Sequence, residues 1–418
     1  MKLKIIMDGV FMHFYERHIT QVITRLAARK STLILTGPRQ VGKSTLLTHL
    51  LPGTRYITLD DPILRLNAEE NPAGFMAQNP PPIIIDEIQK APLLLDYIKM
   101  KVDAVQTPGQ YFLTGSHMWG LMEGVQESLA GRAGIIRMLG LSQRETNKIK
   151  YAAPFMPIME QVEKMERPPF DYNETVRLIH GGSFPELHKL GYTMADWKDF
   201  YSSYLQSYIE KDVKDRIRAE NMSAFTKFIR GCASLSGEQL NITLLGEMCG
   251  MSANTIKSWL SVLEKDGHIF LLRPYANNEN KRLVKLPKLY FLDTGMLCFL
   301  SGWNTPEQLV NGARWGHIFE TFIFTEILKS YYNDGTLYPP LYYYRDKDKN
   351  EIDLIIENGD TLHPIKIKAT TQPTSRMVKQ FSTLDKFSKK RGPGALICMN
   401  GNTMALNESV MNFYPGLI

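Results

Sequence analysis

One stretch of this chain constrains its fold more than any other. The run Gly37-Pro38-Arg39-Gln40-Val41-Gly42-Lys43-Ser44 matches the phosphate-binding pattern G-x-x-x-x-G-K-[ST] at every fixed position. In such a loop the backbone amides close on a polyphosphate, the lysine reaches the β- and γ-phosphates, and the serine hydroxyl holds Mg²⁺. The flanks agree, because residues 31–36 read as a buried strand and residues 44–51 as a helix that opens directly after the loop. The phosphates would then lie at a helix N-terminus, where unpaired amides favour anions.

This pattern predicts two ligands, ATP and Mg²⁺. The residues expected to contact the nucleotide are Gly37, Pro38, Arg39, Gln40, Val41, Gly42, Lys43, Ser44 and Thr45.

Length and composition indicate a globular protein of several domains. A chain of 418 residues with 44% hydrophobic and 22% charged residues has enough sequence for two or three cores. The net charge of +6 permits a nucleic-acid partner without requiring one.

The four cysteines are far apart, which argues against a zinc site or a disulfide framework. No apolar run approaches the roughly 20 residues of a membrane span, and the N-terminus lacks a secretory core, so we expect a cytoplasmic protein with no membrane partner.

A second signal is a buried strand that ends in two acids. The run Ile83-Ile84-Ile85-Asp86-Glu87 would bring its carboxylates to the same sheet edge as the phosphate loop. Asp86 is predicted to hold Mg²⁺ through a water molecule, together with Ser44. Glu87 is predicted to act as the general base that activates the attacking water.

Two further runs are weaker candidates for the same site. Residues 111–116 read as a strand with a polar tip, where Thr114 or Ser116 would position the water or sense the γ-phosphate; an ordinary strand end is the alternative. The run at residues 128–132 presents Arg132, which would neutralise charge on the transferring phosphoryl group, in its own subunit or across a subunit interface. A surface salt bridge is the competing interpretation of Arg132.

The pattern of apolar residues divides the chain into four segments. Residues 16–145 alternate strands and helices, which indicates a parallel sheet with crossover helices, and residues 146–221 are mostly helical. In residues 222–300, a helix is followed by a turn at Gly250 and by a second helix over 253–266, which Ser252 begins and Gly267 ends. A strand at 268–272 comes next. This order is the outline of a winged helix-turn-helix. Residues 301–418 read as a second α/β unit with a helix at 317–329 and strands at 341–345, 352–357 and 363–368.

Several motifs then occur in the order of one family. The phosphate loop is followed by Ile-Asp-Glu-Ile-Gln-Lys, Leu-Thr-Gly-Ser, Leu-Ala-Gly-Arg and Gly-Gly-Ser-Phe-Pro-Glu, and later by the runs at 288–295 and 316–320. The chain resembles the predicted AAA+ superfamily ATPases of bacteria and archaea that carry the C-terminal domain of unknown function 4143. The resemblance covers residues 16–387. It implies an α/β P-loop NTPase core of the AAA+ type, a winged-helix middle and a restriction-endonuclease-like C-terminal domain.

A restriction-endonuclease-like domain raises the question of nuclease activity. Such nucleases bind Mg²⁺ with an acid on one strand and acid-x-lysine on the next, often assisted by a helix glutamate. Here Glu320 lies on the helix and Asp353 on a strand, but Lys366-Ile367-Lys368 puts a lysine where the second acid belongs. Exchanging acid for base moves two charges, each worth roughly 4 kcal/mol near 4 Å at an effective dielectric of about 20. We therefore expect a degenerate site, with Glu320, Asp353 and Lys368 as remnants.

The sequence leaves the partner of the middle segment open. Its second helix would expose Asn254, Thr255, Lys257, Ser258 and Ser261. The lysines and arginine at 281, 282, 285 and 288 form a basic cluster that would suit a phosphate backbone. A solvated loop or a protein-docking surface explains the cluster equally well. DNA and a protein therefore both stand as partners, and an arginine acting across subunits would imply a nucleotide-linked homo-oligomer.

The leading hypothesis from sequence is Mg²⁺-dependent ATP hydrolysis that drives or switches the appended domains. The first alternative is a nucleotide-gated DNA-binding regulator with little turnover. The second alternative, disfavoured by Lys366, is an ATP-dependent nuclease.

Overall fold

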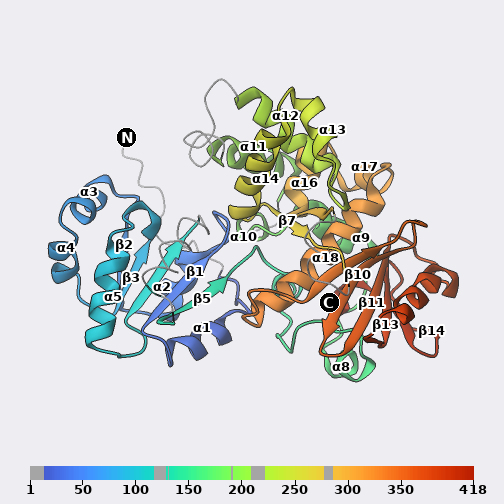
Figure 1. The fold of residues 1–418 in the computed structure, drawn as a ribbon, viewed down its shortest axis with the longest axis horizontal. Helices are drawn as coiled ribbons and strands as arrows, with labels where there is room; N and C mark the ends of the chain where they lie inside the picture. Colours follow the sequence, from blue (N-terminus) through green and yellow to red (C-terminus); the bar gives the residue numbers. More distant parts are fainter. Residues whose placement is uncertain (1–13, 117–128, 130, 190–191, 209–221, 277–285) are drawn as a thin grey trace, which may run out of the picture.

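The computed structural model of the protein describes residues 14–116, 129, 131–189, 192–208, 222–276 and 286–418. These form an N-terminal α/β unit, a mostly helical middle unit and a C-terminal α/β unit (Figure 1). Ser128 and Ala130 of the arginine run, and Lys281, Arg282 and Lys285 of the basic cluster, lie outside the described residues. Across the described ranges, no helix has the length and apolar character needed to span a bilayer.

The N-terminal unit is built on the parallel sheet that the sequence predicts. Its five strands have the order β2-β3-β4-β1-β5 and all neighbouring pairs are parallel. The strands are β1 (Thr32–Thr36), β2 (Arg55–Thr58), β3 (Ile83–Asp86), β4 (Tyr111–Gly115) and β5 (Ala133–Arg137). The helices are α1 (Thr20–Ala27), α2 (Lys43–Leu50), α3 (Pro62–Glu70), α4 (Pro72–Gln78) and α5 (Leu94–Ala104), with a 3₁₀ turn η1 (Ile88–Lys90).

Helices cover both faces of this sheet, which explains why β1 is a continuous apolar run. Leu33 and Leu35 of β1 belong to the core on the side of α1 and α2, whereas Ile34 belongs to the core on the side of α4 and α5. All five residues of β1 are buried. Alternation of side chains across β1 thus supplies both cores, and the phosphate loop lies at the carboxyl edge of the sheet because it follows β1.

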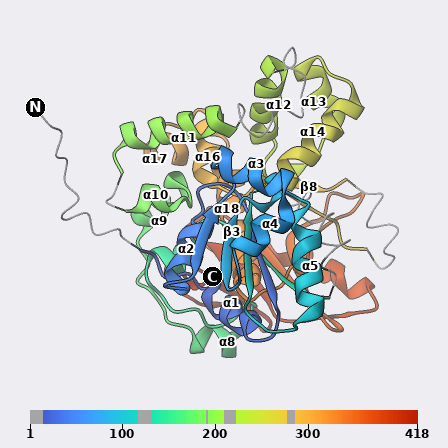
Figure 2. The same cartoon turned by 90° about the vertical axis from the view of Figure 1, so that its left-hand side faces the viewer.

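A helical connection leads from this unit to the middle unit. It contains α7 (Gln143–Thr146), α8 (Met159–Lys164), α9 (Tyr172–Gly181), α10 (Pro185–His188) and α11 (Met194–Tyr208). The middle unit continues with α12 (Met222–Ser234), β6 (Glu238–Gln239), α13 (Ile242–Cys249), α14 (Ala253–Lys265), β7 (Ile269–Leu272), β8 (Lys288–Phe291), α16 (Thr294–Ser301) and α17 (Pro306–Val310). Figure 2 shows α12, α13 and α14 packed together on one side of the molecule.

The turn and cap residues of the middle unit lie where the sequence places them. Gly250 ends α13 with φ +69°, and the Ser252 hydroxyl accepts a hydrogen bond from the Thr255 amide to begin α14. Gly267 ends α14 with φ +77°, a conformation that favours glycine. Strands β6, β8 and β7 form a small antiparallel sheet beside these helices. The winged helix-turn-helix assignment itself stays a prediction.

The C-terminal unit places a long helix against a mixed sheet. Its elements are α18 (Trp315–Asn333), β9 (Leu341–Arg345), β10 (Glu351–Asn358), β11 (Thr361–Lys368), η4 (Ser375–Lys386), β12 (Lys390–Arg391), β13 (Gly394–Cys398), β14 (Ala405–Asn407), β15 (Val410–Phe413) and η5 (Pro415–Leu417). The sheet order is β14-β15-β13-β11-β10-β9, with β12 beside β11. Helix α18 is buried on nearly every side, as expected for a helix that is apolar all round.

The three units share one hydrophobic core. A continuous cluster of buried side chains runs from Ile19 through Tyr201, Phe291 and Ile323 to Ile418. The C-terminal unit also has a smaller cluster of its own, around Ile355 and Phe381. The units therefore pack as one body, with α18 between the middle unit and the C-terminal sheet (Figure 1).

A buried carboxylate joins two distant motifs of the sequence. Asp293 begins α16 and accepts from the Met296 amide at 2.6 Å and from the Tyr201 hydroxyl at 2.7 Å. Its other oxygen accepts from the amide and hydroxyl of Ser183, at 2.7 and 2.8 Å. The Gly-Gly-Ser turn before α10 is thereby fixed to the end of β8.

Replacing Asp293 by alanine should destabilise the whole chain. The amide and hydroxyl of Ser183 would lose their buried acceptor and Tyr201 would keep only the Gly181 carbonyl, so we expect the free energy of unfolding to fall by about 3 kcal/mol or more. Urea unfolding followed by circular dichroism measures the loss. Asp360→Ala, at an exposed turn, is the matched control and should stay within about 0.5 kcal/mol of the parent. Equal stability of the two variants would show that the Asp293 contacts contribute little.

Candidate nucleotide-binding site

The phosphate loop connects β1 to α2 at the carboxyl edge of the sheet. A Cβ atom on Gly37 would lie 1.9 Å from the carbonyl oxygen of Met138, so only glycine fits at that position. Gly42 has φ +92° and directly precedes α2, whose first residue is Lys43. The loop therefore closes tightly and ends at the N-terminus of α2, where unpaired amides favour an anion.

The Lys43 ammonium lies over the mouth of this loop. It donates hydrogen bonds to the carbonyl oxygens of Gly37 at 2.9 Å and Pro38 at 2.8 Å, and the residue is only 6% exposed. A positive charge held at this place is available to phosphate oxygens that enter the loop.

Asp86, at the end of β3, is held by donors from three neighbouring elements. The Ser44 hydroxyl donates to one carboxylate oxygen at 2.9 Å, and the Thr114 hydroxyl donates to the same oxygen. The Tyr56 hydroxyl donates to the other oxygen at 2.7 Å. Burial and then the hydrogen bond to Asp86 raise the pKa of Tyr56 far above its usual value, so it stays a donor. Tyr56 did not stand out in the sequence, because only the pairing of β2 with β3 brings it to this carboxylate.

Glu87 comes next in a left-handed backbone conformation, with φ +58°. This conformation is uncommon for a residue with a side chain, and such strain is concentrated at functional sites. The Ser116 hydroxyl donates to the Glu87 carboxylate at 3.1 Å, and the side-chain amide of Gln89 donates to the same oxygen. The fold thus brings Glu87 and Ser116 together beside Asp86, as their positions at neighbouring strand ends predict. Their roles in hydrolysis stay predictions.

Arg132 lies at the other edge of the sheet. It directly precedes β5, and the register pairs Ala133 with Thr32 at the start of β1, whereas the phosphate loop comes after the end of β1. The strand separates the two edges by about 13 Å at roughly 3.3 Å per residue. The guanidinium forms an ion pair with Asp103 on the surface. Arg132 therefore does not reach the loop of its own subunit, and an action across a subunit interface stays a prediction.

A buried arginine that the sequence did not single out supports the loop from behind. Arg17, 6% exposed, donates to the carbonyl of Val41 at 2.8 Å and to that of Leu139 at 2.7 Å, and pairs with Glu145 at 3.1 Å. Burial opposes ionisation of Glu145, but the Arg17 guanidinium, His18 and the backbone hydrogen bonds together outweigh burial and lower the pKa of that carboxyl. Both groups are therefore charged, and their pair ties the loop to the start of α7.

The middle unit touches the phosphate loop directly. A Cβ atom on Gly267, at the end of α14, would lie 3.0 Å from Cγ of Pro38. His268, Leu292 and Asp293 line the same small gap as Pro38 and Val41. The loop therefore lies between its own sheet and the backbone that leaves α14.

The acidic centre of the C-terminal unit contains lysine ammonium groups. Lys366 lies 2.7 Å from one oxygen of Asp353, whose other oxygen accepts from the Ile367 amide at 2.7 Å. Lys288 lies 2.9 Å from Glu320. This corrects the expectation that Lys288 belongs to a surface basic cluster, because the residue is only 2% exposed and cannot contact a nucleic-acid backbone. Lys368, at the end of β11, is exposed.

Comparison with known proteins assigns domains to most of the chain. Residues 29–147 match the AAA domain, residues 173–307 match a domain of unknown function (DUF8612), and residues 315–415 match another domain of unknown function (DUF4143). Two relatives, uncharacterized proteins of Mycobacterium tuberculosis and Mycobacterium bovis, are each 26% identical over 369 residues, with 84% of this chain and 73% of the relative aligned.

Solved structures show distant likeness only. A Walker-type ATPase of Pyrococcus abyssi has a TM-score of 0.44 and 14% identity, over 69% of this chain and 96% of that one. AMPPCP-bound DnaA from Aquifex aeolicus has a TM-score of 0.24 and 11% identity, over 59% of this chain and 86% of that one. On its domain matches, the chain contains an AAA-type P-loop domain followed by the domain of unknown function DUF4143.

Proposed function

We propose that the protein binds ATP with Mg²⁺ and hydrolyses it to ADP and phosphate. The observation that carries this proposal is the 2.9 Å contact between Ser44 and Asp86, with Glu87 and Ser116 directly beside it. A loop that only bound a phosphate group would need no second carboxylate at the adjoining strand end. The AAA domain match over residues 29–147 supports the same activity.

The donor set fits a magnesium ion. Ser44 and Asp86 offer the hydroxyl and carboxylate oxygens that Mg²⁺ prefers, and the ion usually keeps several of its own waters. When bound, Mg²⁺ neutralises charge on the phosphates. Lys43 then holds the phosphate oxygens, and Glu87 accepts a proton from the attacking water while Ser116 orients the carboxylate. Arg132 is proposed to act only from a neighbouring subunit, which would make the active form an oligomer.

We further propose that the nucleotide state is transmitted to the middle unit through Pro38. Its ring packs against Gly267, where α14 ends and the chain turns into β7. Protein interiors are densely packed, so a shift of the loop on binding phosphate must displace this backbone or be resisted by it. The contact therefore supports a switch in which ATP changes the position of the helix-turn-helix.

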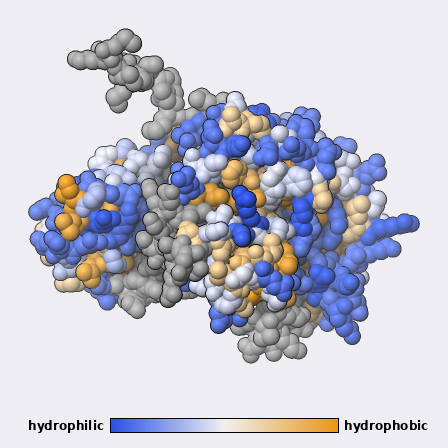
Figure 3. Space-filling view, turned by 90° about the horizontal axis from the view of Figure 1, so that it is seen from above, coloured by the Kyte–Doolittle hydropathy of each residue, from blue (hydrophilic) through white to orange (hydrophobic). Residues whose placement is uncertain are grey.

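The partner of that switch is a separate question. Helix α14 exposes Lys257 and small polar side chains, while α13 exposes Leu244 and Met248. Seen from above, polar and apolar residues are interspersed over the molecule (Figure 3). We propose DNA as the partner to test first, with a protein as the alternative; both suit a cytoplasmic ATP-using protein. Nuclease activity is not proposed, because ammonium groups contact Glu320 and Asp353.

Replacing Glu87 by glutamine should abolish turnover without abolishing binding. The amide cannot accept the proton, so we expect steady-state phosphate release to fall by about 100-fold or more while ATP still binds. Glu69→Gln, an exposed change on α3, is the matched control and should keep the parent rate. A parental rate in Glu87→Gln would exclude its role as base. Absence of turnover in the parent, with and without DNA, would leave a binding switch instead.

Replacing Lys43 by alanine should remove nucleotide binding itself. The ammonium is the positive charge at the loop mouth, so both ATP affinity and phosphate release should be lost. Fluorescent ATP-analogue titration measures the affinity. Undiminished binding would mean that the nucleotide does not occupy this loop.

The proposed switch predicts a difference between two glycines. Gly267→Ala and Gly250→Ala introduce a side chain at similar positive φ, so each should cost about 1 kcal/mol of stability. Only the first adds an atom against Pro38, since the space around Gly250 is open. We expect Gly267→Ala to change ATP affinity by about fivefold or more, a coupling near 1 kcal/mol, and Gly250→Ala to leave it unchanged. Identical affinities in both variants would remove this route of coupling.

A further inference from the structure

The side chain of Lys288 crosses from the middle unit into the C-terminal unit. It starts on β8 and contacts Glu320 of α18 at 2.9 Å and Glu351 of β10 at 2.5 Å. The Tyr290 hydroxyl, also from β8, donates to the same Glu320 oxygen at 2.7 Å. Two neighbouring side chains of one unit therefore satisfy a carboxylate of the other.

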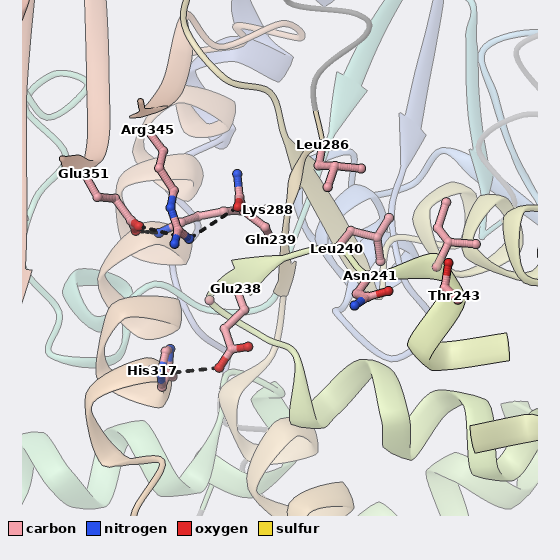
Figure 4. Close-up of a pocket in the computed structure, with 12 residues that line it drawn as sticks. Glu238, Gln239, Leu240, Asn241, Thr243, Leu286, Lys288, His317, Arg345 and Glu351 are labelled. Carbon is pink, nitrogen blue, oxygen red and sulfur yellow. Dashed lines mark hydrogen bonds and ion pairs between the residues drawn. The ribbon is translucent and has the colours of Figure 1, made fainter. Parts of the chain in front are cut away.

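The charges around this contact are balanced. Each carboxylate has a cation within 4 Å, in the pairs Lys288–Glu320, Lys288–Glu351, Arg345–Glu351, Arg314–Glu238 and Lys366–Asp353. Figure 4 shows Lys288 and Arg345 converging on Glu351, with His317 beside Glu238. The four acids and four bases leave no net charge for a further ion to neutralise.

Lys288 carries its charge despite its burial. Removal from water would lower the pKa of its ammonium, but the surrounding carboxylates, Glu320 foremost, outweigh that effect and raise it well above the usual value. A buried charge persists only when it is paired and hydrogen-bonded. Glu320 and Glu351 supply those partners, and the lysine in turn allows Glu320 to be buried.

We propose that Lys288 is the resident cation of this acidic centre, and that the centre serves as an ionic lock between the middle unit and the C-terminal unit. The ammonium lies between Glu320 and Glu351 and supplies the positive charge that both carboxylates contact. The lock holds β8 against α18 and β10 whether or not the phosphate loop hydrolyses ATP.

Removal of the ammonium would leave an acidic centre that solvent ions can reach. Glu320 would lose its cation, Glu351 would keep only Arg345 at 3.6 Å, and Asp353 lies near enough to affect Glu320 electrostatically. The contact opens onto a cavity of about 640 Å³ lined by Lys288, His317, Arg345 and Glu351, so ions from solvent have access. A divalent cation is then the simplest replacement for the missing charge.

The test is Lys288→Met, which keeps the length and apolar stem of the side chain but removes the charge. Without nucleotide, we expect its unfolding temperature to fall by about 6 °C or more, as for a broken buried ion pair. Millimolar Mn²⁺ should restore part of the loss. Electron paramagnetic resonance should show Mn²⁺ bound by Lys288→Met, and this binding should disappear in Lys288→Met/Glu320→Gln. Lys347→Met, an exposed change between β9 and β10, is the control and should match the parent in both measurements.

Two results would overturn the proposal. An unfolding temperature equal to that of the parent would show that Lys288 is not a lock. An equal response of Lys288→Met and Lys347→Met to Mn²⁺ would show that the ammonium does not stand in for a metal. If Lys288→Met fails to fold, the neutral variant Lys288→Met/Glu320→Gln/Glu351→Gln should fold, because no buried charge is left unpaired. Failure of that variant would also contradict the charge-balance argument.

Discussion

The buried carboxylate of Asp293 is the interaction on which the placement of the middle unit beside the phosphate loop depends. It accepts from Ser183, Tyr201 and Met296, so the end of β8, the turn before α10 and helix α11 meet at one point. Such a carboxylate is stable in the interior only when its oxygens are satisfied. The same Ser183 accepts at its carbonyl from the Leu141 amide at 2.7 Å, close to the residues that Arg17 holds behind the phosphate loop. Hydrogen bonds to buried charges therefore fix the middle unit on the nucleotide site.

Local patterns in the sequence predict the N-terminal unit well. The phosphate loop lies between a strand and a helix, and two later strands carry Asp86 and Thr114 near their ends. This order predicts both the sheet and the side chains at its carboxyl edge. The ends of α13 and α14 are equally predictable, because Gly250, Ser252 and Gly267 are turn and cap residues at the required spacing. These elements depend on neighbours in sequence, so the chain alone reveals them.

Contacts between distant segments are hidden from the sequence. Lys288 comes after other basic residues and therefore resembles part of a surface cluster, yet the pairing of β8 with β6 and β7 turns it toward α18. Arg132 comes after a Gly-containing turn and resembles a phosphate-sensing arginine, yet its place before β5 puts it at the wrong edge of its own sheet. Tyr56 and Arg17 are single residues without a motif, and only the fold brings them to Asp86 and to the loop carbonyls. In each case the residue type permits several roles, and its position in the folded structure decides which one it has.

The two inter-unit contacts lie on one continuous path of backbone. Pro38 of the loop packs on Gly267 at the end of α14, β7 comes directly after it, and β7 pairs along its length with β8, which carries Lys288. A displacement at Gly267 cannot be absorbed between β7 and β8 without breaking their hydrogen bonds, so it must either move β8 or be resisted by the lock on α18. The lock joins buried charges, and separating them would leave Glu320 without its cation, so the lock strongly opposes such a displacement. Helices α13 and α14 come before Gly267 in the chain, whereas the lock comes after it. Motion in the proposed switch should therefore appear in α13 and α14, while the C-terminal sheet stays fixed and serves as the support against which that motion occurs.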